Sequence, residues 1–325
     1  MEPAPTTKPV DGRFSIVVPS FQQGEFLERT LQSVLGQREV DVEVIVQDGG
    51  STDQSVGILK RYEDRVRWES RGDGGQAVAI NSGLQKSSGE YIGYLNSDDI
   101  LYPGALREVR EFFEAHSEAM VVYGLADFID NRDQMIAAYP IEPWSYARLR
   151  EDCIICQPAC FIRRSVWERF GPFDPALHYA MDYEYWLRVG AVETFHFLPK
   201  KLAGSRYHGS AKTFDRSREA HRETIAVLRR YHAGQIPPSW IIAYARHCGE
   251  ERLREGGLLP VRWTKFAVSY WANLLALTPQ VTPGGWRTLL REFGPPYPSA
   301  CRRLRDPLGY LKKDLFADPG APTDG

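Results

Sequence analysis

Residues 93–101 read GYLNSDDIL, an apolar run that ends abruptly in the polar cluster Asn96-Ser97-Asp98-Asp99. Like charges side by side repel each other, so Asp98 and Asp99 need a compensating partner. Two interpretations of this segment alone are open. The first is an Asx-type turn, in which the side chains accept backbone N–H groups. The second is a divalent cation, for which carboxylate oxygens are natural ligands.

Short apolar runs alternate with segments of helical periodicity through the first third of the chain. The runs predict strands at 14–18, 42–46, 66–69 and 91–95. The periodic segments predict helices at 25–37, 53–62, 76–86 and 104–116. Strands that alternate with helices of this length indicate an α/β fold with a mostly parallel, doubly wound sheet.

Each predicted strand is followed by glycines or short polar residues. In open parallel sheets, ligands bind beyond the carboxyl ends of the strands. Four polar loops should therefore meet at one rim of the sheet, at 19–22, 48–53, 71–76 and 96–99. Four such loops on one rim favour a ligand site over four independent turns. They also favour the cation as the partner of Asp98 and Asp99.

The composition is that of a globular protein without a membrane span. Hydrophobic residues make up 43% and charged residues 25% of the 325 positions, enough to fill a core. Five cysteines, an odd number, favour buried thiols in a reducing compartment over a disulfide framework. Residues 1–12 lack the apolar region of a secretory signal and read as a disordered lead-in. We therefore expect a cytoplasmic protein, with peripheral contact at the inner face of the membrane as a further possibility.

The charge is distributed unevenly along the chain. Residues 216–325 hold 17 Lys and Arg against 10 Asp and Glu, whereas residues 1–215 hold 23 against 32. We expect a catalytic body at 13–214 and a basic, aromatic, helical extension at 215–325. Its helix at 260–277 has two open interpretations: an interfacial helix that touches anionic lipid, or a layer packed on the body or on a second subunit of a homodimer.

Several motifs, in this order, resemble the family 2 glycosyltransferases, which have the GT-A fold. The resemblance covers about residues 13–210 and rests on FSIVVPSFQQGEFLERTLQSVLGQ (14–37), VIVQDGGSTDQS (44–55), DGGQAVAINSGLQKSSGEYIGYLNSDDILYPGAL (73–106) and YAMDYEYWLRVG (179–190). It implies an inverting enzyme that moves a sugar from a nucleotide diphosphate donor, a UDP-sugar by default, to a hydroxyl of a glycan or lipid-linked glycan. A cell-surface polysaccharide or glycoconjugate would be the product.

The resemblance assigns roles to residues that match the motifs. Asp99 would bind Mn²⁺ or Mg²⁺, and His208 would reach the same metal or the diphosphate. A metal of this kind neutralises the leaving diphosphate. The nucleotide would be held by Pro19, Ser20, Phe21, Asp48, Asp73, Gly75, Gln76 and Asp98.

The segment 179–190 would supply the catalytic base. Asp182 matches that position, since inverting transfer needs a carboxylate near the acceptor hydroxyl. The resemblance also suggests contacts to the acceptor or to the diphosphate from four further residues, Glu184, Trp186, Arg206 and Lys212.

The sequence departs from the family pattern in three places. Many relatives have Asp at the position of Asn96, Arg at that of Ile80 and Glu at that of Met181. The base of the nucleotide is therefore not fixed by the sequence.

Other functions find less support. A non-catalytic nucleotide-sugar binder or a membrane-associated scaffold on the same fold is the alternative to an enzyme. No phosphate-binding or dinucleotide motif indicates a kinase or dehydrogenase, and an acidic body without a reading module disfavours nucleic acid. Cys153, Cys156 and Cys160 lack a convincing fourth ligand and read as structural residues.

Overall fold

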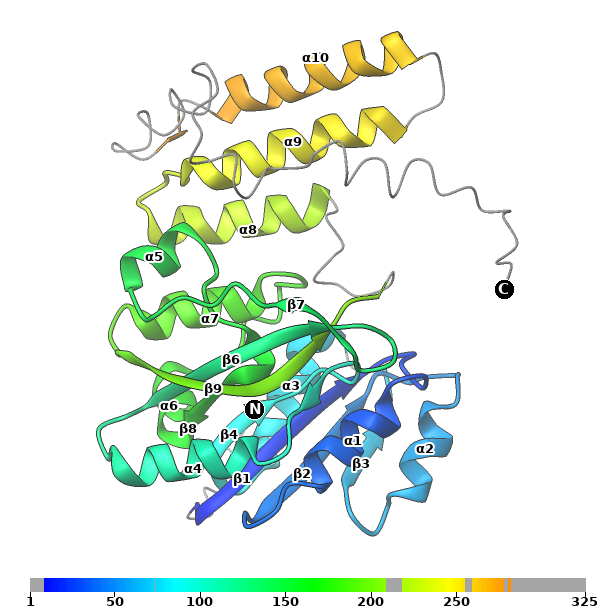
Figure 1. The fold of residues 1–325 in the computed structure, drawn as a ribbon, viewed down its shortest axis with the longest axis vertical. Coiled ribbons are helices and arrows are strands. Elements are labelled where there is room, and N and C mark those ends of the chain that lie inside the picture. The colour runs from blue at the N-terminus through cyan, green and yellow to red at the C-terminus, as the bar shows by residue number, and fades with distance from the viewer. Residues whose placement is uncertain (1–8, 73, 209–217, 255–258, 278–279, 282–325) are drawn as a thin grey trace.

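The computed structural model describes residues 9–72, 74–208, 218–254, 259–277 and 280–281. Helices and strands alternate through the first part of the chain, as predicted (Figure 1). These elements are β1 (Val10–Ser20), α1 (Leu27–Leu35), β2 (Val42–Asp48), α2 (Ser55–Arg61), β3 (Arg67–Ser70), α3 (Gln76–Gln85), β4 (Gly89–Tyr94), β5 (Ile100–Leu101) and α4 (Ala105–Ala115). The expectation of strands and helices here is confirmed, with small shifts at their ends.

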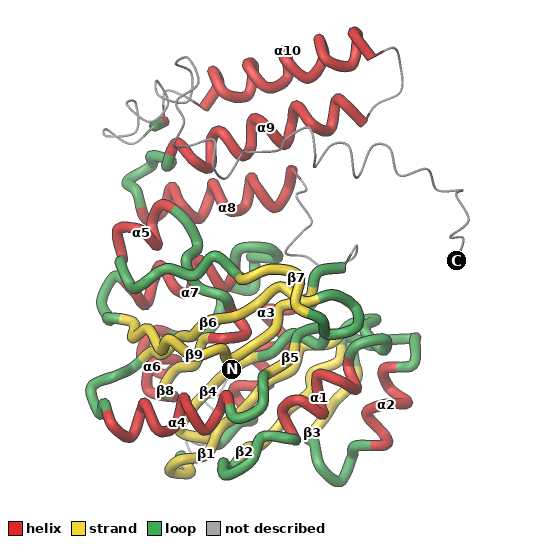
Figure 2. The backbone as a smooth tube through the Cα atoms, viewed as in Figure 1, coloured by secondary structure: helices red, strands yellow, loops and turns green. Residues whose placement is uncertain are grey.

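The second part of the chain completes the sheet and adds helices. Its elements are β6 (Val121–Ile129), β7 (Met135–Ala138), α5 (Tyr146–Glu151), β8 (Cys160–Arg163), α6 (Arg164–Phe170), α7 (Met181–Gly190) and β9 (Phe195–Arg206). Three helices follow, α8 (Arg218–Tyr231), α9 (Pro238–Arg254) and α10 (Leu259–Leu277). They stack as a layer on the side of the molecule where α5 and α7 lie (Figure 2).

The sheet has the order β3-β2-β1-β4-β8-β6-β9-β5, with β7 paired to β6. Strands β3, β2, β1 and β4 run parallel, and so do β6 and β9, which confirms a mostly parallel sheet. Strand β8 is antiparallel to both of its neighbours. The carboxyl ends of β1, β2, β3 and β4 therefore meet at one edge.

Two hydrophobic cores cover the two faces of the sheet. One holds apolar side chains of α1, α2 and α4, and the other those of α3, α6 and α7. Val227 and Leu228 of α8 belong to the second core, so this helix packs directly on the body. A third, smaller core joins α8 to α9 and α10 through Ile225, Ile241 and Leu274.

The sequence left two interpretations of the C-terminal helices open, and the structure shows them packed as a layer on the body. On α10, Leu274 is buried, whereas Val268 and Trp271 are exposed. No helix in the described ranges is long and apolar enough to cross a membrane. Contact with lipid or with a second subunit stays a prediction, and the boundary expected at 214–215 lies outside the described residues.

Helix α3 approaches β1 closely at a glycine. A Cβ on Gly83 would lie 2.5 Å from Cγ1 of Val17, inside a filled core. We predict that Gly83→Ala lowers the free energy of unfolding by about 1–3 kcal/mol, because overpacking forces strain on the core. Urea denaturation followed by circular dichroism measures the change.

The matched control for this substitution is Gly57→Ala, in the exposed part of α2, where an added Cβ meets nothing within 4 Å. It should stabilise the protein by about 0.5–1 kcal/mol, because alanine is the better helix former. Equal effects of the two substitutions would contradict the close packing of α3 on β1.

Candidate active site

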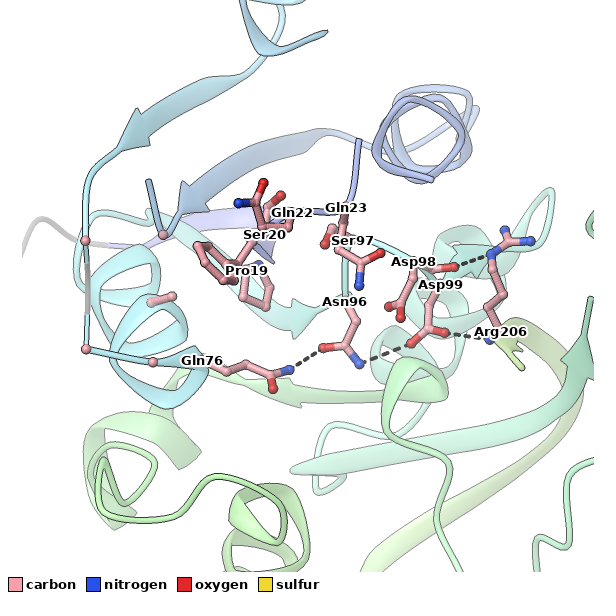
Figure 3. Close-up of a pocket in the computed structure, with 16 residues that line it drawn as sticks. Pro19, Ser20, Gln22, Gln23, Gln76, Asn96, Ser97, Asp98, Asp99 and Arg206 are labelled. Carbon is pink, nitrogen blue, oxygen red and sulfur yellow. Dashed lines mark hydrogen bonds between the residues drawn. The ribbon is translucent and has the colours of Figure 1, made fainter. Parts of the chain in front are cut away.

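A pocket lies beyond the carboxyl ends of β1 and β4, where the polar loops were expected to meet (Figure 3). Its volume is about 640 Å³. The residues that line it are Pro19, Ser20, Phe21, Gln22, Gln23, Gly49, Gly72, Gly74, Gly75, Gln76, Ala79, Asn96, Ser97, Asp98, Asp99 and Arg206. We call this cavity the donor pocket, after the nucleotide-sugar donor that the family resemblance predicts. It brings together residues from four loops that are far apart in the sequence.

Asp99 is a buried carboxylate at the end of β4, with 3% of its surface exposed. Its Oδ1 accepts from the backbone N–H of Arg206 at 2.8 Å, and its Oδ2 accepts from Nδ2 of Asn96 at 3.2 Å. Burial, and next the charge of Asp98, raise the pKa of Asp99 well above its usual range. A cation at this edge would offset both effects.

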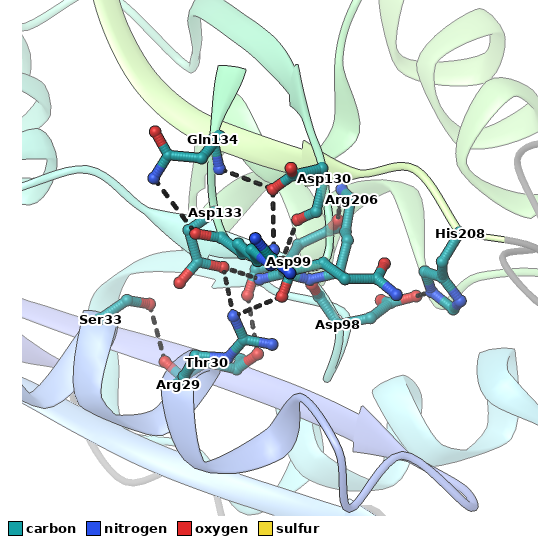
Figure 4. Close-up of polar contacts among 12 residues, drawn as sticks. Arg29, Thr30, Ser33, Asp98, Asp99, Asp130, Asp133, Gln134, Arg206 and His208 are labelled. Atoms are coloured by element: carbon teal, nitrogen blue, oxygen red, sulfur yellow. Dashed lines mark hydrogen bonds and ion pairs between the residues drawn. The ribbon is translucent and has the colours of Figure 1, made fainter. Parts of the chain in front are cut away.

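Asp98 is paired with a histidine from the other side of the site. Nε2 of His208 lies 2.9 Å from Oδ2 of Asp98, and His208 is 8% exposed. The ring also packs against Phe26 at a centroid distance of 4.8 Å. The structure thus brings the expected metal-binding residues Asp99 and His208 to the same edge as Asp98 (Figure 4).

Arg206 connects the Asp98-Asp99 turn to the turn at 130–133. Nε of its guanidinium donates to the carbonyl of Asp98 at 2.6 Å, and Nη1 donates to the carbonyl of Asp130 at 2.5 Å. Nη2 pairs with Asp133, and the side chain is fully buried. The guanidinium therefore binds protein groups of the 130–133 turn (Figure 4), which leaves little of it for a diphosphate.

Asp48 is buried and does not line the donor pocket. Its Oδ2 accepts from Ser51 N at 2.8 Å and Ser70 Oγ at 2.6 Å, and its Oδ1 accepts from Ser51 Oγ at 2.6 Å. Its visible role is to fix the loop after β2. Contact with a nucleotide base stays a prediction.

Six of the eight expected nucleotide-binding residues line the donor pocket, namely Pro19, Ser20, Phe21, Gly75, Gln76 and Asp98. Pro19, Ser20 and Phe21 follow β1, and Phe21 is 60% exposed. The Oγ of Ser20 is buried without a hydrogen-bond partner in the described part of the chain, so it can serve a ligand. Gly75 precedes α3 with φ of +120°, a backbone conformation that side chains rarely adopt.

The glycine loop also reaches the end of β4. Nε2 of Gln76 donates to Oδ1 of Asn96 at 2.6 Å. This contact links the loop before α3 to the Asp98-Asp99 turn. Asp73, in the same loop, lies outside the described residues, and so does Lys212.

A second pocket of about 320 Å³ adjoins the first and shares Gln76, Asn96 and Asp99 with it. We call it the acceptor pocket, after the acceptor that the family resemblance predicts near Asp182. Most of its other lining side chains come from the segment 153–158, from the start of α7 and from the C-terminal helices. They are Tyr94, Tyr139, Cys153, Cys156, Gln157, Pro158, His178, Tyr179, Ala180, Met181, Asp182, Tyr183, Ser205, Ala220, His221, Thr224 and Trp240.

Asp182 faces this second pocket from the first turn of α7. Its Oδ1 accepts from the backbone N–H of Tyr183 at 2.7 Å. Removal of water raises the pKa of Asp182 to about 6. A carboxylate with a raised pKa at the wall of a cavity is suited to accept a proton near neutral pH.

Glu184 and Trp186 lie elsewhere, although they share a helix with Asp182. Glu184 pairs with Arg188 at 3.0 Å and accepts from Tyr231 Oη at 2.6 Å. Trp186 is buried in the second core, edge-on to Phe195. Neither residue is among those that line the two pockets. Successive residues of a helix point in different directions, so one helix presents only some of its side chains to a site.

Sequence reasoning missed most of the acceptor pocket. Tyr139, His178, His221 and Trp240 all line it, and they come from separate segments without a common motif. Cys153 and Cys156 line it as well, and burial raises the pKa of both thiols. This burial suits the structural role predicted for these cysteines.

The donor set at the end of β4 fits a hard divalent cation in its chemistry, since two carboxylates and an imidazole lie at one edge. Within the described ranges, no group of three such side chains converges on one point. A cation here would thus be held by one or two side chains and completed by phosphate oxygens and water, as is usual for Mg²⁺.

A family model matches about half of the chain. Residues 15–170 match the family model described as glycosyl transferase family 2. The chain therefore carries a family 2 glycosyltransferase domain, which confirms the resemblance seen in its motifs.

Relatives and solved structures agree with this assignment. The chain is 25% identical over 209 residues to an uncharacterized glycosyltransferase of Rickettsia prowazekii, covering 61% of this chain and 65% of the relative. It is 28% identical over 218 residues to the chondroitin synthase of Escherichia coli, covering 65% of this chain but 32% of the relative. The chain thus spans from about two thirds to one third of the length of these relatives.

Solved structures share the fold. Residues 1–349 of S. aureus TarS, in complex with UDP-GlcNAc, superpose with a TM-score of 0.56 at 15% identity, covering 81% of each chain. The mannosyltransferase PcManGT of Pyrobaculum calidifontis, in complex with GDP-Man and Mn²⁺, superposes with a TM-score of 0.50 at 18% identity, covering 96% of this chain and 83% of that one. Both confirm a GT-A architecture.

The buried Arg206 generates a prediction for stability. Arg206→Ala should lower the free energy of unfolding by about 3 kcal/mol, because it removes a fully buried guanidinium and leaves part-buried acceptors of the 98 and 130–133 segments without their donor. Arg29→Ala is the matched control, because Arg29 pairs with the same Asp133 from a partly exposed position and should cost below about 1 kcal/mol. Chemical denaturation measures both, and equal losses would contradict the bracing role of Arg206.

Proposed function

We propose that this chain is an inverting glycosyltransferase that moves a sugar from a nucleotide diphosphate donor to an acceptor hydroxyl group. One observation carries the proposal. The donor and acceptor pockets adjoin at Gln76, Asn96 and Asp99, with Asp98 on the donor side and Asp182 on the acceptor side. A donor sugar at this junction would have the leaving diphosphate on one side and the attacking hydroxyl on the other, as inversion requires.

The donor pocket supports a nucleotide in its chemistry and size. Pro19, Ser20 and Phe21 would contact the nucleoside, and the glycines before α3 allow its close approach. A UDP-sugar is our first choice, because S. aureus TarS was solved with UDP-GlcNAc. A GDP-sugar is the alternative, since PcManGT was solved with GDP-Man.

We propose a divalent cation, Mn²⁺ or Mg²⁺, at Asp99, with Asp98 and His208 beside it. A cation there would neutralise the negative charge that develops on the leaving diphosphate. The high pKa of Asp99 supports this proposal, because the buried carboxylate lacks a full counter-charge from the described residues. The Mn²⁺ in PcManGT supports it by analogy of fold.

Asp182 would act as the general base. The acceptor oxygen attacks the anomeric carbon and forms the new glycosidic bond, while the bond from that carbon to the diphosphate oxygen breaks. The proton of the acceptor hydroxyl passes to the carboxylate of Asp182, and the nucleoside diphosphate leaves with the bonding electron pair. A carboxylate with a pKa of about 6 is mostly ionised at neutral pH and still basic enough to accept that proton.

The acceptor pocket supports a glycan, free or lipid-linked, as the second substrate. Its wall combines the aromatic residues Tyr139, Tyr179 and Trp240 with the polar His178 and Thr224, the mixture typical of small-molecule sites. The similarity to a chondroitin synthase favours a role in polysaccharide or glycoconjugate synthesis.

Loss of either carboxylate should abolish transfer for different reasons. Asp182→Asn removes the base and should lower kcat by about 10²–10⁴-fold. Asp99→Asn weakens the cation site and should lower turnover about a hundredfold or more. Nucleotide release from UDP- and GDP-sugars, with Mn²⁺ and then with EDTA, measures both effects.

Asp64→Asn is the control for these variants, because Asp64 is exposed and lines neither pocket. Calorimetric binding of a donor without turnover for any acceptor would favour a non-catalytic nucleotide-sugar binder. Failure to bind any nucleotide sugar would contradict the proposed function altogether.

The raised pKa of Asp182 predicts the acid limb of the pH profile. Below about pH 6 the carboxylate is protonated and cannot accept the acceptor proton, so kcat/KM should fall tenfold per pH unit. Initial rates between pH 4.5 and 8, at fixed metal and ionic strength, test this. An acid limb near the ordinary value for aspartate, about pH 4, would contradict the role of Asp182.

A further inference from the structure

The carboxylate of Glu223, on α8, binds the backbone of the segment that leads into α7. Its Oε1 accepts from the N–H groups of His178 at 3.0 Å, Tyr179 at 2.6 Å and Ala180 at 2.7 Å. Its Oε2 accepts from His178 N at 2.9 Å. One side chain of the C-terminal helices thus binds three consecutive N–H groups of the catalytic body.

These N–H groups lie immediately before the first turn of α7. The N–H groups at a helix N-terminus have no partner within the helix, and the helix dipole favours a negative charge there. Of the three N–H groups, that of Ala180, the N-cap of α7, is such a helix-terminal donor, and Glu223 supplies its acceptor together with a negative charge. We call the hydrogen bonds from Glu223 to the 178–180 backbone the clamp. Asp182 follows Ala180 by two residues, so the clamp fixes the backbone from which the proposed base projects.

Helix α8 is itself packed on the body. Val227 and Leu228 are buried in the second core, and Tyr231 Oη donates to Glu184 at 2.6 Å. Arg230 pairs with Asp174 at 3.2 Å. These contacts lie toward the C-terminal end of α8, which leaves Glu223 at the end nearer the acceptor pocket.

The same helix forms part of the wall of the acceptor pocket. Ala220, His221 and Thr224 line that pocket, and Trp240 of α9 joins them. Glu223 lies between these lining residues in the sequence and binds His178, Tyr179 and Ala180, which line the pocket too. The clamp therefore joins two walls of one cavity.

We infer that Glu223 is a positioning residue for the transfer reaction, which holds the 178–180 backbone so that Asp182 meets the acceptor hydroxyl. The inference rests on the proposed function. Helix α8 would then contribute to catalysis at the acceptor pocket as well as to its wall. The competing view is that Glu223 only caps a helix and affects stability.

Glu223→Ala and Glu223→Gln separate these views. Glu223→Ala removes all four hydrogen bonds and should speed hydrogen exchange at the 178–180 amides. It should lower kcat about a hundredfold, since a displacement near 1 Å costs that much, while the calorimetric Kd for donor nucleotide stays unchanged. Glu223→Gln keeps a carbonyl oxygen at the position of Oε1, which contacts all three N–H groups, and should restore kcat to within about tenfold of wild type.

Glu219→Gln is the matched control, because it removes the same charge from the exposed side of the same helix. It should change neither amide exchange nor kcat. If Glu223→Ala fails to fold, Glu223→Gln decides the matter, provided that its thermal midpoint matches wild type. Its kcat should then lie below that of Glu219→Gln, with faster exchange at 178–180.

The outcomes that overturn the inference are distinct from the failure of the proposed function. Faster exchange at 178–180 with unchanged kcat in the Glu223 variants would leave Glu223 as a structural cap only. Unchanged exchange would show that the clamp does not form. A wild-type protein that binds nucleotide sugars but transfers none would overturn the proposed function, and the positioning role with it.

Discussion

The site depends on the burial of one carboxylate, that of Asp99, at the end of β4. Burial of a charge is costly unless it is paired and hydrogen-bonded, and in the described part of the chain the Asp99 carboxylate accepts from the backbone N–H of Arg206 and from the side-chain amide of Asn96. Several neighbouring groups contact Asp99 or the turn that carries it. The end of β9 donates to it, and the Arg206 guanidinium braces its turn against the 130–133 segment. Under the proposed function, a cation bound at this edge would supply further positive charge for Asp99 and for the diphosphate of the donor.

The acceptor side is formed by helices and the segments before them, whereas the donor side is formed by loops. Its proposed base lies in the first turn of a helix, the segment before that turn is held by Glu223, and its wall is completed by helices beyond the sheet. The donor side is formed by loops on a rigid sheet edge, whereas the acceptor side depends on how α8 packs against α7. A glycosyltransferase domain that keeps the first arrangement while changing the second could accept new acceptors without losing its donor.

The donor side could be predicted from the sequence, whereas most of the acceptor side could not. Strand periodicity and the polar residues after each strand located Pro19, Ser20, Asp98 and Asp99, because parallel strands bring their carboxyl ends to one edge. Asp182 was found through a motif. Arg206 lines the donor pocket, and its guanidinium binds the 130–133 turn, a contact that local sequence does not reveal. Glu223 and Trp240 carry no motif, and only tertiary packing brings them to the site.

The most direct test is a crystal structure of the protein with Mn²⁺ and either UDP or GDP. We predict that the nucleoside lies against Pro19, Ser20 and Phe21, with the diphosphate and the metal beside Asp98 and Asp99. The acceptor pocket should stay open, with Asp182 facing the β-phosphate across the junction at Gln76 and Asn96. A nucleotide seated in the pocket beside Asp182 and Trp240, or a metal bound away from Asp99, would contradict the division of the site into donor and acceptor sides.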